Sequence, residues 1–332
     1  MPKSRHKIAL LFCGGSAIVD GEKVISVQKA ADIAAWLKVV PEISLIADIE
    51  PVFIFGEDAS EIKPALWGKL ANEIHSRINK YDGFVVTHGV DTMIYTSAMI
   101  SYMLQNFNKP VIFTGSPLSA EVTESDKQDL SGLISGYRSL GVKANLINAI
   151  QVATMDIAET AIMFGNRLIR ARQAMKSDAP SFNFFEAYKE GMLGKVDFGI
   201  KLFNTVNKRS RQKARLNHKI EERVCLMQLY PGAGPEILSN LINKKCQGII
   251  VKSFHTNLFP DNYKPILEKA YKNKIPVVAH NLSALDIKKK KREYILVNNM
   301  TFENTFVRFM WALGQTRDLG KLRILMWEDF DS

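Results

Sequence analysis

The chain has 332 residues, which is enough for two domains that each bury a core. Its apolar content of 46% and charged content of 23% are ordinary for a globular protein, and no apolar run approaches the ~20 residues of a membrane-spanning helix. The net charge of +10 raises the question of nucleic acid, and most of the excess lies in residues 208–219 and 288–292. Neither segment has interleaved aromatic residues, so we interpret both as solvated and expect no nucleic-acid partner, with weak RNA association left open.

Three cysteines are too few and too widely spaced to suggest a cross-linked fold. Cys13, Cys225 and Cys246 predict no disulfide framework and no zinc site, a pattern typical of the reducing cytoplasm. Cys13 stands beside a Gly-Gly turn, where it is either a nucleophile or, as we favour, a small buried thiol at a strand end. We therefore expect a cytoplasmic protein that holds no metal.

The first half of the chain alternates between strands and helices. The basic start is followed by too short an apolar run for a secretory signal, so a first strand is predicted there. The apolar spacing predicts strands at 8–12, 51–55, 84–86 and 110–113 and helices at 27–39, 64–78, 93–104 and 130–140, followed by strand-like runs at 146–153 and 157–164. This alternation predicts a doubly wound, mainly parallel α/β sheet.

A change of composition marks the domain boundary. Residues 204–222 are charged and show little apolar periodicity, and strands and helices resume at 224. We predict a larger N-terminal domain at 1–203, a basic linker at 204–222 and a smaller C-terminal α/β domain at 223–332.

Polar loops follow four of the predicted strands. They carry Gly15-Ser16, Ala59-Ser60, Gly89-Val90-Asp91 and Thr114-Gly115-Ser116. Because the carboxyl ends of parallel strands meet at one edge of a sheet, these loops are expected to build a single small pocket. Hydroxyls, amide donors and one carboxylate suit a small zwitterion and acyl transfer by a hydroxyl nucleophile beside an oxyanion hole. Taken singly, Asp91 also fits a helix cap and Ser16 a turn-stabilising hydroxyl.

Several of these strings resemble the bacterial-type L-asparaginases, a family that also includes glutaminases and the archaeal tRNA-dependent amidotransferase subunit. Residues 13–17, Cys-Gly-Gly-Ser-Ala, are similar to the family's Thr-Gly-Gly-Thr-Ile. Residues 87–93 match its Thr-His-Gly-Thr-Asp-Thr-Met except at Val90. Further similar strings stand in order at 109–116, 165–176, 230–232, 275–278 and 299–303. The resemblance covers nearly the whole chain and implies an asparaginase-like fold.

The resemblance implies an amidohydrolase that cleaves the side-chain amide of asparagine, or of a related small amide, without a cofactor. It places the nucleophile at Ser16, the group that holds the substrate ammonium at Asp91 and the catalytic lysine at Lys176. The implied substrate-binding positions are Gly15, Ala59, Ser60, Gly89, Asp91, Ser116 and Asn257. Asn257 would reach the pocket of a neighbouring subunit, because the family forms homodimers that often pair into homotetramers.

Three departures from the family pattern bear on activity. Val90 replaces a threonine of the proton relay, no tyrosine follows Ser16 as far as Val40, and Ala59 offers only its backbone amide where a hydroxyl is common. Losing members of a cooperating catalytic unit costs orders of magnitude in rate. Hydrolysis is therefore expected to be slow or absent unless Ser16 and Lys176 act as a Ser–Lys pair. Two alternatives stay open, namely an impaired homologue that binds a small amino acid or a partner, and an amidotransferase-type subunit with a protein- or RNA-linked substrate.

Overall fold

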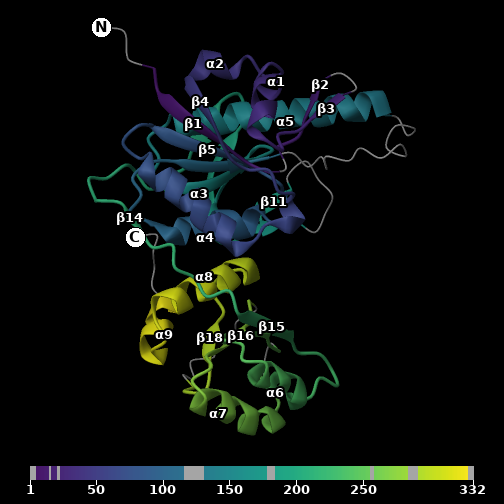
Figure 1. The fold of residues 1–332 in the computed structure, drawn as a ribbon, viewed down its shortest axis with the longest axis vertical. Coiled ribbons are helices and arrows are strands. Elements are labelled where there is room, and N and C mark those ends of the chain that lie inside the picture. The colour runs from purple at the N-terminus through teal and green to yellow at the C-terminus, as the bar shows by residue number, and fades with distance from the viewer. Residues whose placement is uncertain are drawn as a thin grey trace. The chain divides into compact units, whose positions relative to one another are not determined.

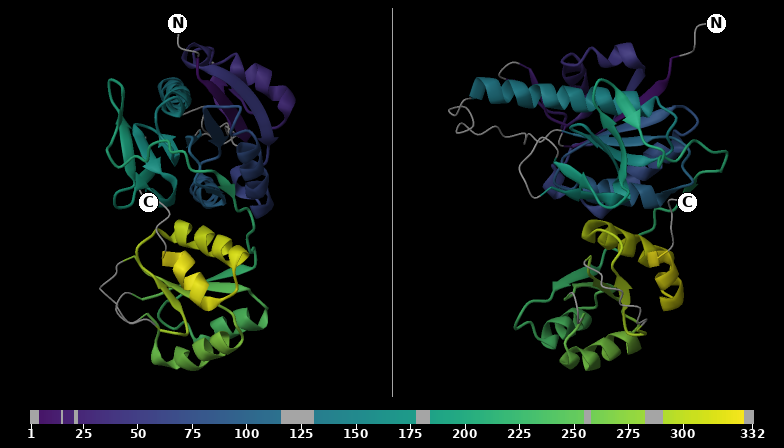
Figure 2. Two further views of the ribbon diagram at one scale, coloured as in Figure 1. Left: turned by 90° about the vertical axis from the view of Figure 1, so that its left-hand side faces the viewer. Right: turned by 180° about the vertical axis from the view of Figure 1, so that it is seen from behind.

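The computed structural model describes residues 5–14, 16–20, 23–115, 131–177, 184–254, 258–282 and 291–327. The chain forms two compact units, Met1–His218 and Lys219–Ser332, each built around a β-sheet with helices on both faces (Figures 1 and 2). The division falls inside the segment 204–222 that the composition marks as a linker. Across the described ranges, no helix has both the length and the apolar content needed to cross a bilayer.

The first unit contains an eight-stranded sheet of order β13-β12-β9-β8-β7-β5-β1-β4. Its strands are β1 (Lys7–Cys13), β4 (Asp48–Phe55), β5 (Gly83–His88), β7 (Val111–Thr114), β8 (Thr160–Phe164), β9 (Arg167–Arg170), β12 (Met192–Val196) and β13 (Ile200–Leu202). Strands β4, β1, β5, β7 and β8 run parallel, whereas β9, β12 and β13 extend the sheet with antiparallel pairs. The whole of β5 and β7 is buried, as expected for parallel strands that helices cover on both sides.

Helices cover both faces of this sheet (Figure 1). On one face lie α1 (Ile33–Leu37), α2 (Ile43–Ile46) and α5 (Ser131–Ala153), and on the other lie α3 (Pro64–Ser76) and α4 (Met93–Met103). Trp36, Val40 and Ile150 pack against Leu10 and Val85 in one apolar core. The predicted doubly wound, mainly parallel α/β fold is thus confirmed.

The strand expected at 146–153 is wrong, because these residues form the last turns of α5. Val142, Leu146, Ala149, Ile150 and Ala153 are buried, which is the three-to-four residue period of a helix facing a sheet. The run is short and mostly apolar, which resembles a strand, but Asn148 and Gln151 interrupt it at the three-residue spacing of a helix.

Small two-stranded sheets also belong to the first unit. They pair β2 (Ile18–Asp20) with β3 (Lys23–Ile25), β10 (Ala174–Lys176) with β11 (Phe185–Ala187), and β6 (Leu104–Gln105) with β14 (Arg215–Leu216). The second of these pairs carries Lys176 at the end of a strand.

The second unit is a four-stranded parallel sheet of order β15-β16-β17-β18. Its elements are β15 (Val224–Gln228), α6 (Pro235–Asn243), β16 (Gly248–Lys252), α7 (Lys264–Lys272), β17 (Val277–His280), β18 (Ile295–Val297), α8 (Phe302–Gln315) and α9 (Leu319–Trp327). Helices α6 and α7 pack on the face that carries Met227, Ile249 and Val251. Figure 1 shows α8 and α9 on the opposite side of the sheet.

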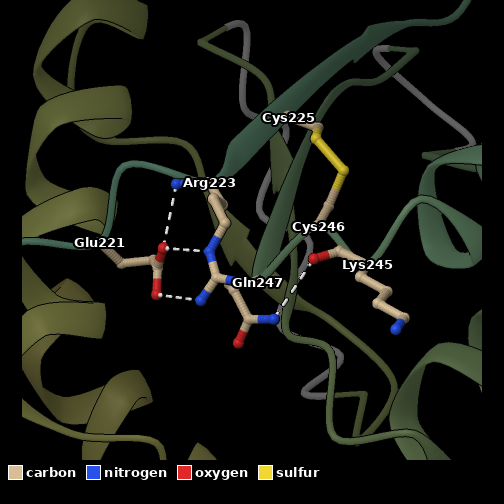
Figure 3. Close-up of a disulfide and its surroundings, with 6 residues drawn as sticks. All are labelled: Glu221, Arg223, Cys225, Lys245, Cys246 and Gln247. Carbon is tan, nitrogen blue, oxygen red and sulfur yellow. Dashed lines mark hydrogen bonds and ion pairs between the residues drawn. A yellow bond between two sulfur atoms is a disulfide. The ribbon is translucent and has the colours of Figure 1, made fainter.

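The cysteine prediction is wrong for one pair. Cys225 on β15 and Cys246, just before β16, form a disulfide with their Cα atoms 6.1 Å apart (Figure 3). The β15–α6–β16 crossover brings the chain back beside its starting strand, and a spacing of 21 residues does not reveal this in the sequence. The cysteine pattern therefore no longer supports a reducing compartment. Cys13 is a free, buried thiol, and burial raises its pKa well above the ordinary value, so it is a poor nucleophile.

Candidate functional site

The described residues of the four polar loops lie at one edge of the first sheet. Strands β4, β1, β5 and β7 are parallel neighbours, and Cys13 pairs with His88 at the end where all of them finish. The loops after β4 and β5 are in direct contact, because a Cβ built on Gly89 would lie 2.5 Å from Ala59 Cβ. Thr92 Oγ1 also donates a hydrogen bond of 2.8 Å to the carbonyl of Ala59. The carboxyl edge therefore gathers the residues from which a site would be built.

The turn after β1 depends on a glycine. Gly14 has φ +67°, and a Cβ at this position would lie 1.8 Å from the carbonyl oxygen of Glu57. Its amide donates to Phe55 O over 2.9 Å, which ties the turn to β4. Trp36 Nε1 then donates to the carbonyl of Ser16 over 2.8 Å. These contacts fix Ser16 at the sheet edge with only 3% of its surface exposed.

The Ser16 hydroxyl is paired with a second hydroxyl. Ser16 Oγ lies 2.6 Å from Thr87 Oγ1 and 3.2 Å from the carbonyl oxygen of Gly14. Thr87 Oγ1 lies in turn 3.3 Å from Leu11 O, so the two hydroxyls and the carbonyls form a short chain of donors and acceptors. Thr87 belongs to the motif at 87–93, but the sequence assigns it no role. The parallel pairing of β1 with β5 is what brings it to Ser16.

Asp91 and Lys176 form an ion pair at the same edge. Lys176 Nζ lies 3.4 Å from Asp91 Oδ1, and the two side chains are 41% and 68% exposed. A pair this exposed contributes about 0–1 kcal/mol, so a competing cation can displace it. Within the described residues, no hydrogen bond joins Ser16 to Lys176. The Ser–Lys pair considered from the sequence is therefore not formed in this state.

The other predicted positions fall into two groups. Val90 is buried between Gly89 and Asp91, while Ala59 is half-buried and Ser60 is exposed. Gly15, Ser116 and Asn257 lie outside the described residues. In the described ranges, no three His, Cys, Asp or Glu side chains are grouped so as to hold a metal ion.

His88 is a buried residue of the site edge that the sequence does not single out. Its Nδ1 donates to the carbonyl of Gly89 over 2.8 Å, because that carbonyl can only accept. Its Nε2 is buried and has no partner among the described residues, and the ring lies edge-on to Phe55 and Phe113. Burial lowers the pKa of His88 to about 4, so the imidazole is neutral at pH 7. The neutral imidazole thus holds the backbone of the loop before Asp91 through its hydrogen bond to Gly89.

Asn145 fixes the loop after β7 from the facing helix α5. Its Oδ1 accepts from the amide of Gly165 over 2.9 Å, and its Nδ2 donates to Gly115 O over 3.3 Å. Gly115 packs so closely on β5 that an added Cβ would lie 2.1 Å from His88 O. Asn145 stands between the helix expected at 130–140 and the strand-like run at 146–153, so its buried role has no signal in the sequence.

Comparison with known families matches both units. Residues 7–208 match the asparaginase N-terminal domain, and residues 223–326 match the glutaminase/asparaginase C-terminal domain. The chain belongs to the asparaginase/glutaminase family. The resemblance seen in the motifs at 13–17 and 87–93 is thereby confirmed.

Relatives of this family member include two kinds of protein. A glutamyl-tRNA(Gln) amidotransferase subunit from Pyrococcus abyssi is 29% identical over 317 residues, which cover 88% of this chain and 68% of that protein. L-asparaginase 1 of Escherichia coli is 28% identical over 283 residues, which cover 81% and 79% respectively. Among solved structures, L-asparaginase I from Vibrio cholerae superposes with a TM-score of 0.81 at 24% identity and 98% coverage of both chains, which shows the shared fold.

Proposed function

We propose that this asparaginase-family chain is an amidohydrolase that releases ammonia from the side-chain amide of asparagine or a related small amide. The observation that carries the proposal is the placement of two groups on adjacent parallel strand ends. The buried Ser16 hydroxyl, hydrogen-bonded to Thr87, follows β1, and the Asp91 carboxylate, held by Lys176, follows β5. A hydroxyl nucleophile and an ammonium-binding carboxylate are what hydrolysis of an amino-acid amide requires.

The chemistry runs through an ester. Ser16 Oγ attacks the amide carbon and loses its proton, the C–N bond breaks, and the nitrogen leaves as ammonia with that proton. Water then cleaves the ester, which regenerates Ser16 and leaves a carboxylic acid. Asp91 binds the substrate ammonium, which competes with Lys176 for the carboxylate. Lys176, once displaced, is our candidate for the base that takes the Ser16 proton.

Val90 sets the expected rate. It stands beside Asp91 without a hydroxyl, so the proton relay has one member fewer than the family pattern. We expect turnover that is measurable and slow. The site needs no cofactor in this scheme. We infer that the protein works as a homodimer or homotetramer, because the resemblance places Asn257 in a neighbouring subunit's pocket. Sedimentation of the purified chain tests the oligomeric state.

The experiment is ammonia release from asparagine, glutamine and other small amides, measured with a coupled enzyme. Ser16→Ala should abolish release, and Ser16→Thr, which restores the family's usual residue, should keep it within about tenfold of the wild type. Release that is unchanged in Ser16→Ala would overturn the assignment of the nucleophile. No release by the wild type, together with thermal stabilisation by aspartate, would favour a binding protein without turnover.

The relatives favour a second candidate. The chain aligns with an amidotransferase subunit over 88% of its length, so ammonia released here could serve synthesis on an RNA-linked substrate. A comparison of ammonia release by the chain alone and with glutamyl-tRNA and ATP discriminates the two functions. Turnover of free asparagine that tRNA leaves unchanged supports the hydrolase, and release that depends on the charged tRNA supports the amidotransferase.

A further inference from the structure

A cluster of cations in the first unit takes no part in the proposed chemistry. Residues 208–215, the basic segment, carry Lys208, Arg209, Arg211, Lys213 and Arg215, and no Asp or Glu stands between 198 and 220. Four of the five side chains belong to exposed residues, and Arg209 is half-buried. The basic segment therefore concentrates half of the chain's net charge of +10 on one stretch of surface.

Uncharged contacts hold the backbone of the basic segment in place. Arg215 pairs with Gln105 in the short sheet of β14 and β6, close to α3 and α4 (Figure 1). Asn108 Nδ2 donates to the carbonyl of Ser210 over 3.1 Å, and the amide of Asn217 donates to Met103 O over 2.8 Å. These contacts order the segment without involving the side chains of Arg211, Lys213 and Arg215, so less conformational entropy is lost when an anion binds.

Among the described residues, those cations also have no acidic partner. Lys208 Nζ and Arg209 Nη2 donate to backbone carbonyls, those of Asp156 and Met155, over 3.2 Å each. The Asp156 carboxylate accepts from the backbone amide of Arg209 over 3.4 Å. In the part of the chain that the structure describes, no ion pair joins any of the five cations to a carboxylate. Their charge is available to an external anion.

The side chains of the basic segment indicate which kind of anionic partner it binds: a protein, a membrane or a nucleic acid. Large exposed apolar side chains of the described residues lie elsewhere, at Leu45, Phe198, Leu226, Tyr230, Tyr271, Ile324 and Trp327. A protein interface needs aromatic or apolar anchors, and a membrane surface needs an apolar face to insert. A phosphate backbone needs only closely spaced cations, and arginine, three of the five here, binds phosphate in a bidentate manner. We propose that the basic segment binds the sugar–phosphate backbone of a nucleic acid, without reading its sequence.

This surface lies at the opposite edge of the sheet from the candidate site. The amide of Ala158, before β8 begins, donates to Asn207 O over 2.8 Å, and β14 pairs with the residues that follow α4. Ser16 and Asp91 follow the carboxyl ends of the strands, and five residues of strand separate the two edges by roughly 16 Å. Nucleic acid and a small amide should therefore bind independently.

The test is fluorescence anisotropy of a labelled 20-nucleotide oligo(U) with the full chain at several salt concentrations. Arg211→Gln/Lys213→Gln/Arg215→Gln should raise Kd at least tenfold and lower the slope of log K against log salt by about 2, at ~0.7 per phosphate contact. The matched control, Lys244→Gln/Lys269→Gln/Lys272→Gln, removes equal charge from exposed residues of the second unit and should change Kd less than twofold. Oligo(dT) should bind as tightly as oligo(U), because the contacts are to phosphate.

Three results would overturn the inference. They are an equal rise of Kd in the basic-segment variant and the control variant, no binding of oligo(U) by the wild type at 50 mM salt, and tighter binding of poly-glutamate or anionic vesicles than of oligo(U). The double variant Arg211→Gln/Lys213→Gln, which leaves β14 intact, shows whether a loss in the triple variant comes from charge rather than from a disturbed strand. Ammonia release is measured on the same samples with and without oligo(U). Because neither the variants nor the oligonucleotide should change it, failure of nucleic-acid binding is distinguished from failure of the proposed function.

Discussion

Thr87 is the residue that most directly controls the state of the proposed nucleophile. Its hydroxyl is the closest polar partner of Ser16, at 2.6 Å, and both groups are buried. The motifs at 13–17 and 87–93 suffice to propose Ser16 and Asp91 from the sequence. They do not reveal that Thr87 pairs with Ser16, because this contact depends on the register between β1 and β5.

Thr87→Val should lower kcat/KM about tenfold, because the isosteric side chain removes a hydrogen bond worth about 0.5–1.5 kcal/mol from the Ser16 hydroxyl. Thr87→Ser keeps the hydroxyl and should stay within about threefold of the wild type. Steady-state ammonia release measures both. Equal losses in the two variants would show that Thr87 acts through packing alone.

His88 should make stability depend on pH. Its folded-state pKa of about 4 lies below the ordinary 6.5, so the unfolded chain binds more protons between these values and stability is lost as pH falls. Between pH 7 and pH 4.5, this single group should cost about 2–3 kcal/mol of unfolding free energy. His88→Gln should show a correspondingly smaller drop in urea unfolding over the same range. An unchanged drop would contradict the neutral, buried imidazole.

At the level of elements, the residues of the candidate site lie in the tight turns that follow the strands, not in the strands themselves. The strands and most helices follow from apolar periodicity, which is why the doubly wound fold is predictable from the sequence. The exceptions are informative. Residues 146–153 are helical because their buried positions recur every three to four residues, but so short and mostly apolar a run is easily taken for a strand.

Gly14, in the turn after β1, and Gly68, in α3, make a matched pair for substitution by alanine. Gly14→Ala places a Cβ 1.8 Å from Glu57 O at φ +67°, so it should destabilise the first unit by more than about 2 kcal/mol and displace Ser16. Gly68→Ala, within α3, meets no atom within 4 Å and should stabilise the chain by about 0.5–1 kcal/mol. Chemical denaturation measures both. Similar effects of the two substitutions would contradict the described turn.

For the whole molecule, the disulfide acts on the second unit alone. Cys225 and Cys246 both lie in Lys219–Ser332, and the β15–α6–β16 crossover brings them close enough to pair. The few, widely spaced cysteines do not predict this link, because sequence distance says nothing about which strand returns beside which. The division into two units, by contrast, coincides with a change of composition that the sequence shows plainly.

Reduction of the Cys225–Cys246 disulfide should therefore lower the Tm of the second unit and leave that of the first unit unchanged. A loop of this length is stabilised by about 3 kcal/mol when cross-linked, so dithiothreitol or Cys225→Ser/Cys246→Ser should lower the Tm of the second unit. The transition of the first unit should stay within error of the wild type. Calorimetry with and without the reductant checks this, and an equal shift of both transitions would contradict the assignment.

The central claim, that Ser16 and Asp91 form an amide-hydrolysing site weakened by the loss of a hydroxyl at Val90, is tested most directly by Val90→Thr. The substitution restores the family's hydroxyl beside Asp91 with little change of volume. Ammonia release from asparagine should be slow in the wild type and rise at least tenfold in Val90→Thr, and Ser16→Ala should abolish it in both backgrounds. No ammonia from either protein, across asparagine, glutamine and related amides, would contradict the claim.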